Sequence, residues 1–138
     1  MIVGIAQKDG MKYRLPLHDS ICLFSQDSIS KIEHDCVLNT AKWLKRNGFK
    51  VTFLPVDRYG LLDLPRLENV LKKGVSLVSV IHVNNEIGTI QPIKEIGKLC
   101  HEYSSYFHTD AAQSFGKIPI DVKEMNIDLM TSNAHKIY

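Results

Sequence analysis

Short apolar runs alternate along the chain with segments of helical periodicity, and this alternation limits the chain to one class of fold. The clearest apolar run is 75–83, which is rich in β-branched residues and broken only by Ser76, Ser79 and His82. Such a run is typical of a strand that is covered on both faces. Strands that alternate with helices predict a mainly parallel sheet with right-handed crossovers. We therefore expect an α/β fold.

Three helices lie between the predicted strands. The first begins near Ile32, carries an apolar stripe that includes Ala41, and stops at Gly48. Asp63 caps the second helix, which has Pro65 in its first turn. Pro92 opens the third. Further strands are expected at 51–55, 106–109 and 127–131.

Composition and charge exclude several classes of function. The 138 residues are 44% hydrophobic and 23% charged, with a net charge of +2 and no long basic or acidic block. Nothing therefore indicates direct binding to nucleic acid or a membrane, and no apolar run approaches the roughly 20 residues that span a bilayer. The three cysteines, Cys22, Cys36 and Cys100, lack the paired spacing of a metal site. Unpaired cysteines suit a reducing compartment, so we expect a soluble intracellular protein without a metal.

Two of the predicted strands lead to residues whose side chains could bind a ligand or take part in a reaction. The run 106–109 leads to Asp110 and Gln113, and the run 127–131 leads to His135 and Lys136. Ligands of open α/β sheets bind beyond the carboxyl ends of the strands, so these side chains could converge on one ligand. A lysine amine and a carboxylate are what pyridoxal phosphate requires, the first for a Schiff base and the second to keep its ring nitrogen protonated. An ordinary strand-end Asp and a surface Lys explain the same spacing.

Three segments carry a more specific signal. The sequence reads HVNNEIG at 82–88, HTDAAQ at 108–113 and AHKIY at 134–138, with Glu33-His34 upstream. In this order and spacing they closely resemble the cysteine desulfurases of the NifS/IscS type, which are pyridoxal-phosphate enzymes of the class V aminotransferase family. The resemblance implies the three-layer α/β/α fold of aspartate-aminotransferase-like enzymes, here incomplete. Residues 28–138 would be the central part of the large domain, and residues 1–27 an irregular, unassigned segment in which Met1 to Gln7 faintly resembles a family helix.

The resemblance also implies roles for residues around the cofactor ring. Lys136 matches the Schiff-base lysine, which also shuttles protons, and Asp110 matches the partner of the pyridine nitrogen. Gln113 matches the residue that hydrogen-bonds the phenolic oxygen. His34 matches a histidine that stacks on the ring and assists proton transfer. Asn85 matches a residue beside the ring and the substrate carboxylate.

The phosphate of the cofactor would meet two further residues. His135 occupies a position whose side chain contacts the phosphate in the family. Two positions earlier, where the family usually has Ser, this chain has Asn133, whose amide can also donate to a phosphate. His82, His101 and His108 are expected to be structural.

The activity implied by the resemblance is removal of sulfur from L-cysteine, giving L-alanine and an enzyme persulfide. The sulfur would pass to iron–sulfur scaffolds and other acceptor proteins and to tRNA thiolation. The enzyme would be a homodimer, cytoplasmic in a bacterium and mitochondrial in a eukaryote. None of the three cysteines matches the sulfur-accepting cysteine of the family, and we expect the chain to be a fragment of the large domain. Selenocysteine lyase, another class V aminotransferase and a catalytically inactive truncated product are the alternatives.

Overall fold

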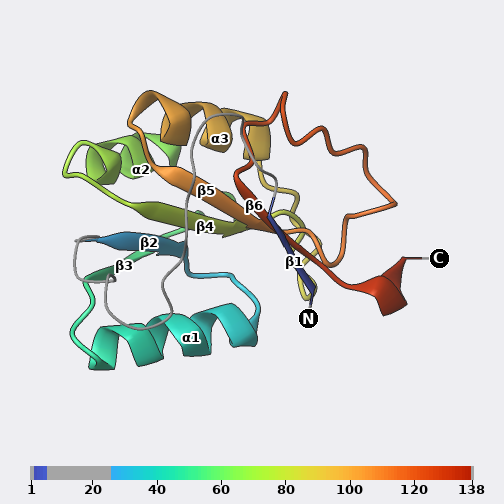
Figure 1. Ribbon diagram of the computed structural model, residues 1–138, viewed down its shortest axis with the longest axis horizontal. Helices are drawn as coiled ribbons and strands as arrows, with labels where there is room; N and C mark the ends of the chain where they lie inside the picture. Colours follow the sequence, from blue (N-terminus) through green and yellow to red (C-terminus); the bar gives the residue numbers. More distant parts are fainter. Residues whose placement is uncertain (1, 6–25, 138) are drawn as a thin grey trace.

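The computed structural model describes residues 2–5 and 26–137, and its centre is a six-stranded sheet (Figure 1). The strands lie in the order β1-β6-β5-β4-β2-β3. Strands β2 to β6 run parallel to one another, and β1 pairs antiparallel with β6. Their bounds are β1 Ile2–Ile5, β2 Asp27–Ser30, β3 Val51–Leu54, β4 Leu77–Ile81, β5 Tyr106–Asp110 and β6 Leu129–Ser132.

Helices cover both faces of the sheet, which confirms the three-layer α/β/α prediction. Helix α1 (Asp35–Arg46) lies on one face, while α2 (Leu64–Leu71) and α3 (Ile93–Glu102) lie on the other (Figure 1). A short 3-10 helix, Ala134–Lys136, follows β6. Among the described residues, no helix combines the length and apolar character needed to cross a membrane.

Each face of the sheet has its own apolar core. On the α1 side, Ile29, Ala41 and Val51 are buried together. On the other side, the side chains of α2, α3, β4 and β5 form a larger core that includes Val78, Ile96 and Phe107.

Successive residues of a strand point to opposite faces, and Val78 and Val80 of β4 both join the larger core. On the other face of β4, Ser79 and Ile81 are also buried, and Ser79 Oγ lies 2.8 Å from Nδ1 of His108. Strand β4 is therefore covered on both faces, as its nearly continuous apolar run predicts.

The helix ends follow from local chemistry. Asp63 is the N-cap of α2, and its side chain accepts a hydrogen bond from the backbone N–H of Arg66 at 3.0 Å. After α1, Gly48 has a φ of +90°, a conformation that glycine adopts without strain. Helix α3 begins after Pro92 as expected, and α1 begins at Asp35 rather than near Ile32, with His34 as its N-cap.

Two features of the amino-terminal part differ from the expectations. Residues Ile2–Ile5 form a strand, so the helix suggested by the resemblance of Met1 to Gln7 is wrong there. The rest of that segment up to residue 25 lies outside the described residues, as does Cys22. Strand β2 was not predicted, because its sequence, DSIS, is short and largely polar, although Ser28 and Ser30 are fully buried.

Candidate active site

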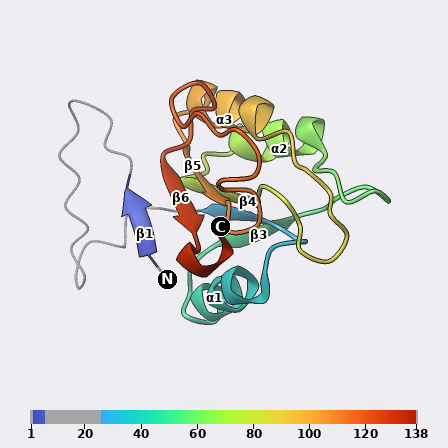
Figure 2. The ribbon, with the colours of Figure 1, turned by 90° about the vertical axis from the view of Figure 1, so that its right-hand side faces the viewer.

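Four neighbouring parallel strands end at one edge of the sheet, and each ends in a predicted site residue or is followed by one. Strand β2 leads to His34, β4 to Asn85, β5 to Asp110 and β6 to Lys136. These strands are adjacent in the order β6-β5-β4-β2, so the four segments lie side by side (Figure 2). This is the edge at which open α/β sheets bind ligands. We call it the carboxyl edge.

Asp110 is the last residue of β5 and the most enclosed of the predicted site residues, being 5% exposed. One of its oxygens, Oδ1, accepts a hydrogen bond from the backbone N–H of Ala112 at 2.9 Å. Its backbone carbonyl accepts from His82 N at 2.9 Å. A carboxylate has about four lone-pair sites, so this anchored group can still accept a hydrogen bond from a ligand.

Gln113 lies in the turn that follows Asp110, and its side chain is half-buried. The next residue, Ser114, is fully buried, and its Oγ lies 2.8 Å from Nδ1 of His82. This contact ties the turn to the residue directly after β4. The position of Gln113 is therefore set by its buried neighbour.

The lysine side of the site follows β6. In the 3-10 helix, the backbone N–H of Lys136 donates to the carbonyl of Asn133 at 3.0 Å. Asn133 and Lys136 are half-buried, and His135 is exposed. Thr131 of β6 is the register partner of Asp110 in β5. Lys136 follows Thr131 by five residues. Asp110 and Lys136 thus come from the ends of adjacent strands.

His34 is the exposed N-cap of α1. Its Nδ1 accepts a hydrogen bond from the backbone N–H of Cys36 at 3.3 Å, and the Sγ of Cys36 lies 3.1 Å from the same nitrogen. An Nδ1 that accepts carries no proton, so the bond assigns the neutral ring to the Nε2–H tautomer.

The two asparagines in the loop after β4 have different environments. Asn84 is buried and holds the loop: its Nδ2 donates to the carbonyl of Ile32 at 2.7 Å, and its Oδ1 accepts from the backbone N–H groups of Glu86 and Ile87. Asn85 is exposed in the turn. The anchored Asn84 therefore presents Asn85 at the carboxyl edge and links this loop to the segment before α1.

Glu33 is a residue of this edge whose burial the sequence did not reveal. It is 5% exposed, and its Oε1 accepts a hydrogen bond from the backbone N–H of Ile81 at the end of β4. Burial raises the pKa of Glu33 to about 8, and the negative charge of Asp110 adds to that effect while the bond from Ile81 opposes it. A glutamate just before a helix usually faces water, so only the resemblance had drawn attention to it.

The two internal histidines are bonded within the fold. His108 lies between Ser79 and Thr131, with Nδ1 at 2.8 Å from one hydroxyl and Nε2 at 2.9 Å from the other. Burial lowers the pKa of His82 and of His108. These contacts fit the structural role expected of both residues. In the described part of the chain, no group of three or more His, Cys, Asp or Glu side chains could hold a metal ion.

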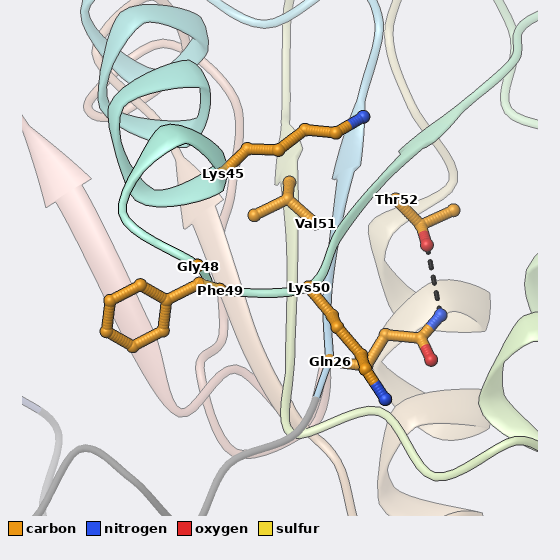
Figure 3. A pocket seen from close by; sticks show the side chains of 7 residues that line it. All are labelled: Gln26, Lys45, Gly48, Phe49, Lys50, Val51 and Thr52. Carbon is orange, nitrogen blue, oxygen red and sulfur yellow. Dashed lines mark hydrogen bonds between the residues drawn. The ribbon is translucent and has the colours of Figure 1, made fainter.

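An open hollow has none of these residues in its lining. Figure 3 shows the side chains that line it. It is lined at the amino-terminal ends of β2 and β3 by Gln26, Val51 and Thr52, and by Lys45 from α1. Gln26 Nε2 donates to Thr52 Oγ1 at 3.0 Å across it. Because it lies at the opposite edge of the sheet, we assign the hollow no part in the site.

Comparison with known proteins agrees with this architecture. A cysteine desulfurase, mitochondrial, of Saccharomyces cerevisiae is 58% identical over 109 residues, which are 79% of this chain and 22% of the yeast protein. A cysteine desulfurase IscS of Ehrlichia chaffeensis is 56% identical over 108 residues, or 78% of this chain and 26% of that protein. The chain thus spans about a quarter of the length of these curated relatives.

Solved structures give the same result. The structure titled "SspA in complex with cysteine" is 45% identical with a TM-score of 0.79, covering 82% of this chain and 33% of SspA. A "NIFS-LIKE PROTEIN" is 36% identical with a TM-score of 0.78, covering 83% of this chain and 32% of that chain. The family model described as "Aminotransferase class-V" matches residues 26–138. On this match, the chain belongs to the class V aminotransferase family.

Proposed function

We propose that this chain forms the cofactor-binding part of a pyridoxal-phosphate-dependent cysteine desulfurase. The observation that carries the proposal is the placement of Asp110 and Lys136 at the ends of adjacent parallel strands. A buried carboxylate and an amine offered at one edge match the two ends of this cofactor, its ring nitrogen and its aldehyde. The high identity to proteins named cysteine desulfurase supports the choice of substrate.

The donor set of the carboxyl edge fits the cofactor. Asp110 would accept a hydrogen bond from the protonated ring nitrogen, and Gln113 would donate to the phenolic oxygen. The imidazole of His34 would lie against the ring face. His135 and Asn133 would donate to the phosphate, and Asn85 would bind beside the ring and the substrate carboxylate. When bound, pyridoxal phosphate supplies an electron sink for the substrate's bonding electrons.

The protein side of the chemistry is binding and proton transfer. Lys136 would hold the cofactor covalently and, once displaced by the substrate amine, would use its free amine to move the α-proton. His34, as the Nε2–H tautomer, can donate a proton at Nε2. Since its Nδ1 already accepts from Cys36, α1 fixes the direction in which that proton points.

For the whole protein we propose conversion of L-cysteine to L-alanine, with the sulfur carried as a persulfide to iron–sulfur scaffolds, other acceptor proteins and tRNA thiolation. SspA, a structural neighbour, binds cysteine, as its title states. We further propose a homodimer that works inside the cell, in the bacterial cytoplasm or the mitochondrion. The mitochondrial and bacterial relatives support this setting.

The cofactor assignment is tested by trapping. The chain is mixed with pyridoxal phosphate, reduced with borohydride and digested, and the peptides are analysed by mass spectrometry. We expect a pyridoxyl adduct on Lys136 that is lost in Lys136→Arg and retained in Lys98→Arg, a control on the exposed face of α3. Asp110→Asn should lower the yield, because the ring nitrogen loses its anionic partner. Folded protein without an adduct, or adducts spread over many lysines, would contradict the assignment.

Substrate class is tested on the complex with pyridoxal phosphate before it is reduced. Before reduction, L-cysteine, L-selenocysteine or L-alanine is added, and displacement of the cofactor from Lys136 is followed by loss of the adduct. Preferential displacement by L-cysteine supports a desulfurase. Displacement by L-selenocysteine alone would favour a selenocysteine lyase instead.

A further inference from the structure

Glu33 is a buried carboxyl group that no step proposed above uses. Its Oε1 accepts from Ile81 N, and its Oε2 is also buried, with no hydrogen-bond partner within the described residues. An ionised carboxylate that is buried without full compensation is costly, so the group favours its neutral form. A neutral carboxyl can still accept the hydrogen bond from Ile81.

The position of Glu33 is set by the sheet. Strand β2 pairs with β4 only as far as Ile29 and Ser79. Two residues further along β4, the backbone N–H of Ile81 meets the Glu33 carboxyl in place of a strand carbonyl. On the other side of β4, Ile81 pairs with Asp110, and the following N–H bonds the Asp110 carbonyl. Glu33 and Asp110 therefore flank the end of β4 from its two sides.

The charge of Asp110 acts on Glu33. It raises the pKa of Glu33 in addition to the larger effect of burial, because an ionised Glu33 would face a second negative charge. Asp110 is the charged side chain that produces this effect, although the segments that meet here also carry Lys31, His34, Asp35, His82 and Glu86.

We propose that Glu33 and Asp110 act as a carboxyl pair with one negative charge, in which neutral Glu33 fixes the end of β4 and the start of α1 while Asp110 carries the charge. Glu33 is thus a positioning residue. It precedes His34 directly, so its hydrogen bond to β4 fixes the N-cap of α1 relative to Asp110. The carboxyl pair does not require pyridoxal phosphate. Only its effect on binding of this cofactor rests on the proposed function.

Carbon-13 NMR of the carboxyl groups tests the pair without any cofactor. The chain is labelled at its Glu and Asp carboxyl carbons and titrated, and Glu33→Gln identifies the Glu33 signal by its loss. We expect that signal to titrate with a midpoint near 8. In Asp110→Asn the midpoint should fall, because the neighbouring negative charge is gone. A midpoint near the ordinary 4.5 would overturn the proposal, and so would a high midpoint that Asp110→Asn leaves unchanged.

Denaturation by urea supplies an independent readout, in case Asp110→Asn does not fold. The folded state holds the Glu33 proton up to about pH 8, whereas the unfolded state releases it near 4.5. The contribution of Glu33 to the free energy of unfolding should therefore fall as the pH rises between these values. Glu33→Gln should remove this part of the slope, and the matched control Glu95→Gln, an exposed residue of α3, should keep it. Equal slopes in the wild type and in Glu33→Gln would contradict the pair.

Trapping with borohydride separates this inference from the proposed function. If the pair positions the site, Glu33→Ala should lower the adduct yield on Lys136 severalfold, while Glu33→Gln, which keeps an acceptor for Ile81 N–H, should restore most of it. Equal yields in both variants would contradict the positioning role. A wild-type chain that shows the Glu33 titration but no adduct would contradict the cofactor assignment alone.

Discussion

The imidazole Nδ1 of His82 lies 2.8 Å from Oγ of Ser114, and both side chains are buried. The Ser114 hydroxyl donates to the carbonyl of Ala111 at 3.4 Å, which leaves its oxygen to accept from the histidine ring. The contact joins the residue after β4 to the turn after Asp110. It therefore holds together two of the strand ends that carry the candidate site.

Replacing Ser114 by Ala should destabilise the fold by about 1 to 3 kcal/mol, because it leaves a buried ring nitrogen of His82 without its partner. Urea denaturation of the wild type, Ser114→Ala, His82→Ala and the double variant measures the coupling. The double variant should lose less than the sum of the single losses. Additive losses would show that the two side chains do not stabilise each other.

Periodicity and turn chemistry predicted most of this fold. The run around β4, the Asp63 cap and the apolar face of α3 are patterns that burial imposes on a sequence, so they can be found without the structure. Strand β2 carries no such pattern, because two of its four residues are buried serines. Its place in the sheet is fixed by pairing with β3 and β4.

The same contrast holds at the site. Asp110 and Lys136 follow apolar runs, so their places at the ends of two strands could be predicted. The burial of Glu33 and the anchoring of the loop by Asn84 depend on bonds to residues 48 and 52 positions away in the sequence. Such contacts leave no local signal. The sequence could therefore predict which residues follow the strand ends, but not the long-range bonds that hold those segments.

The contribution of His82 and His108 to stability should fall as the pH drops below 6.5, because burial favours the neutral form of both rings. The pKa of His82 and that of His108 lie below the ordinary 6.5, so the unfolded chain gains protons at these residues before the folded protein does. Each unit by which the pKa is lowered costs about 1.4 kcal/mol at pH values below both pKa values.

Urea denaturation at several pH values measures this effect, best in a Glu33→Gln background, since Glu33 has the opposite slope. In that background, His108→Gln should reduce the loss of stability at low pH. Lys42→Gln, a change at an exposed residue of α1, is the control and should leave it unchanged. A loss of the same size in both variants would argue against a neutral His108.

Gly97 is a helix residue that alanine should not replace. Alanine normally stabilises a helix by about 1 kcal/mol relative to glycine. Here the added methyl group would overlap the carbonyl oxygen of Met125 and would lie 3.2 Å from Cδ1 of Phe107. Backbone cannot move aside as a flexible side chain can, so we expect a net loss of about 2 to 3 kcal/mol.

Thermal or urea denaturation of Gly97→Ala tests this close approach. Lys98→Ala, at the next and exposed position of α3, serves as the control and should change stability by less than about 0.5 kcal/mol. A Gly97→Ala variant as stable as the wild type would mean that the backbone of Met125 does not lie against Gly97.

The two described cysteines should differ strongly in reactivity towards iodoacetamide. Cys36 is exposed in the first turn of α1, so the reagent can reach its Sγ directly. Cys100 is fully buried in α3, and burial, with a further contribution from Asp128, raises its pKa to about 12. At pH 8 its thiolate fraction is lower than that of an ordinary thiol by a factor of about 1,000 or more.

Peptide mass spectrometry after timed alkylation measures the two rates. A Cys22→Ser background leaves only these two thiols. We expect Cys36 to be modified within minutes and Cys100 to remain unmodified until urea unfolds the chain, when both should react at similar rates. Rapid alkylation of Cys100 in the folded protein would contradict its burial between α3 and the sheet, and with it the core on that face.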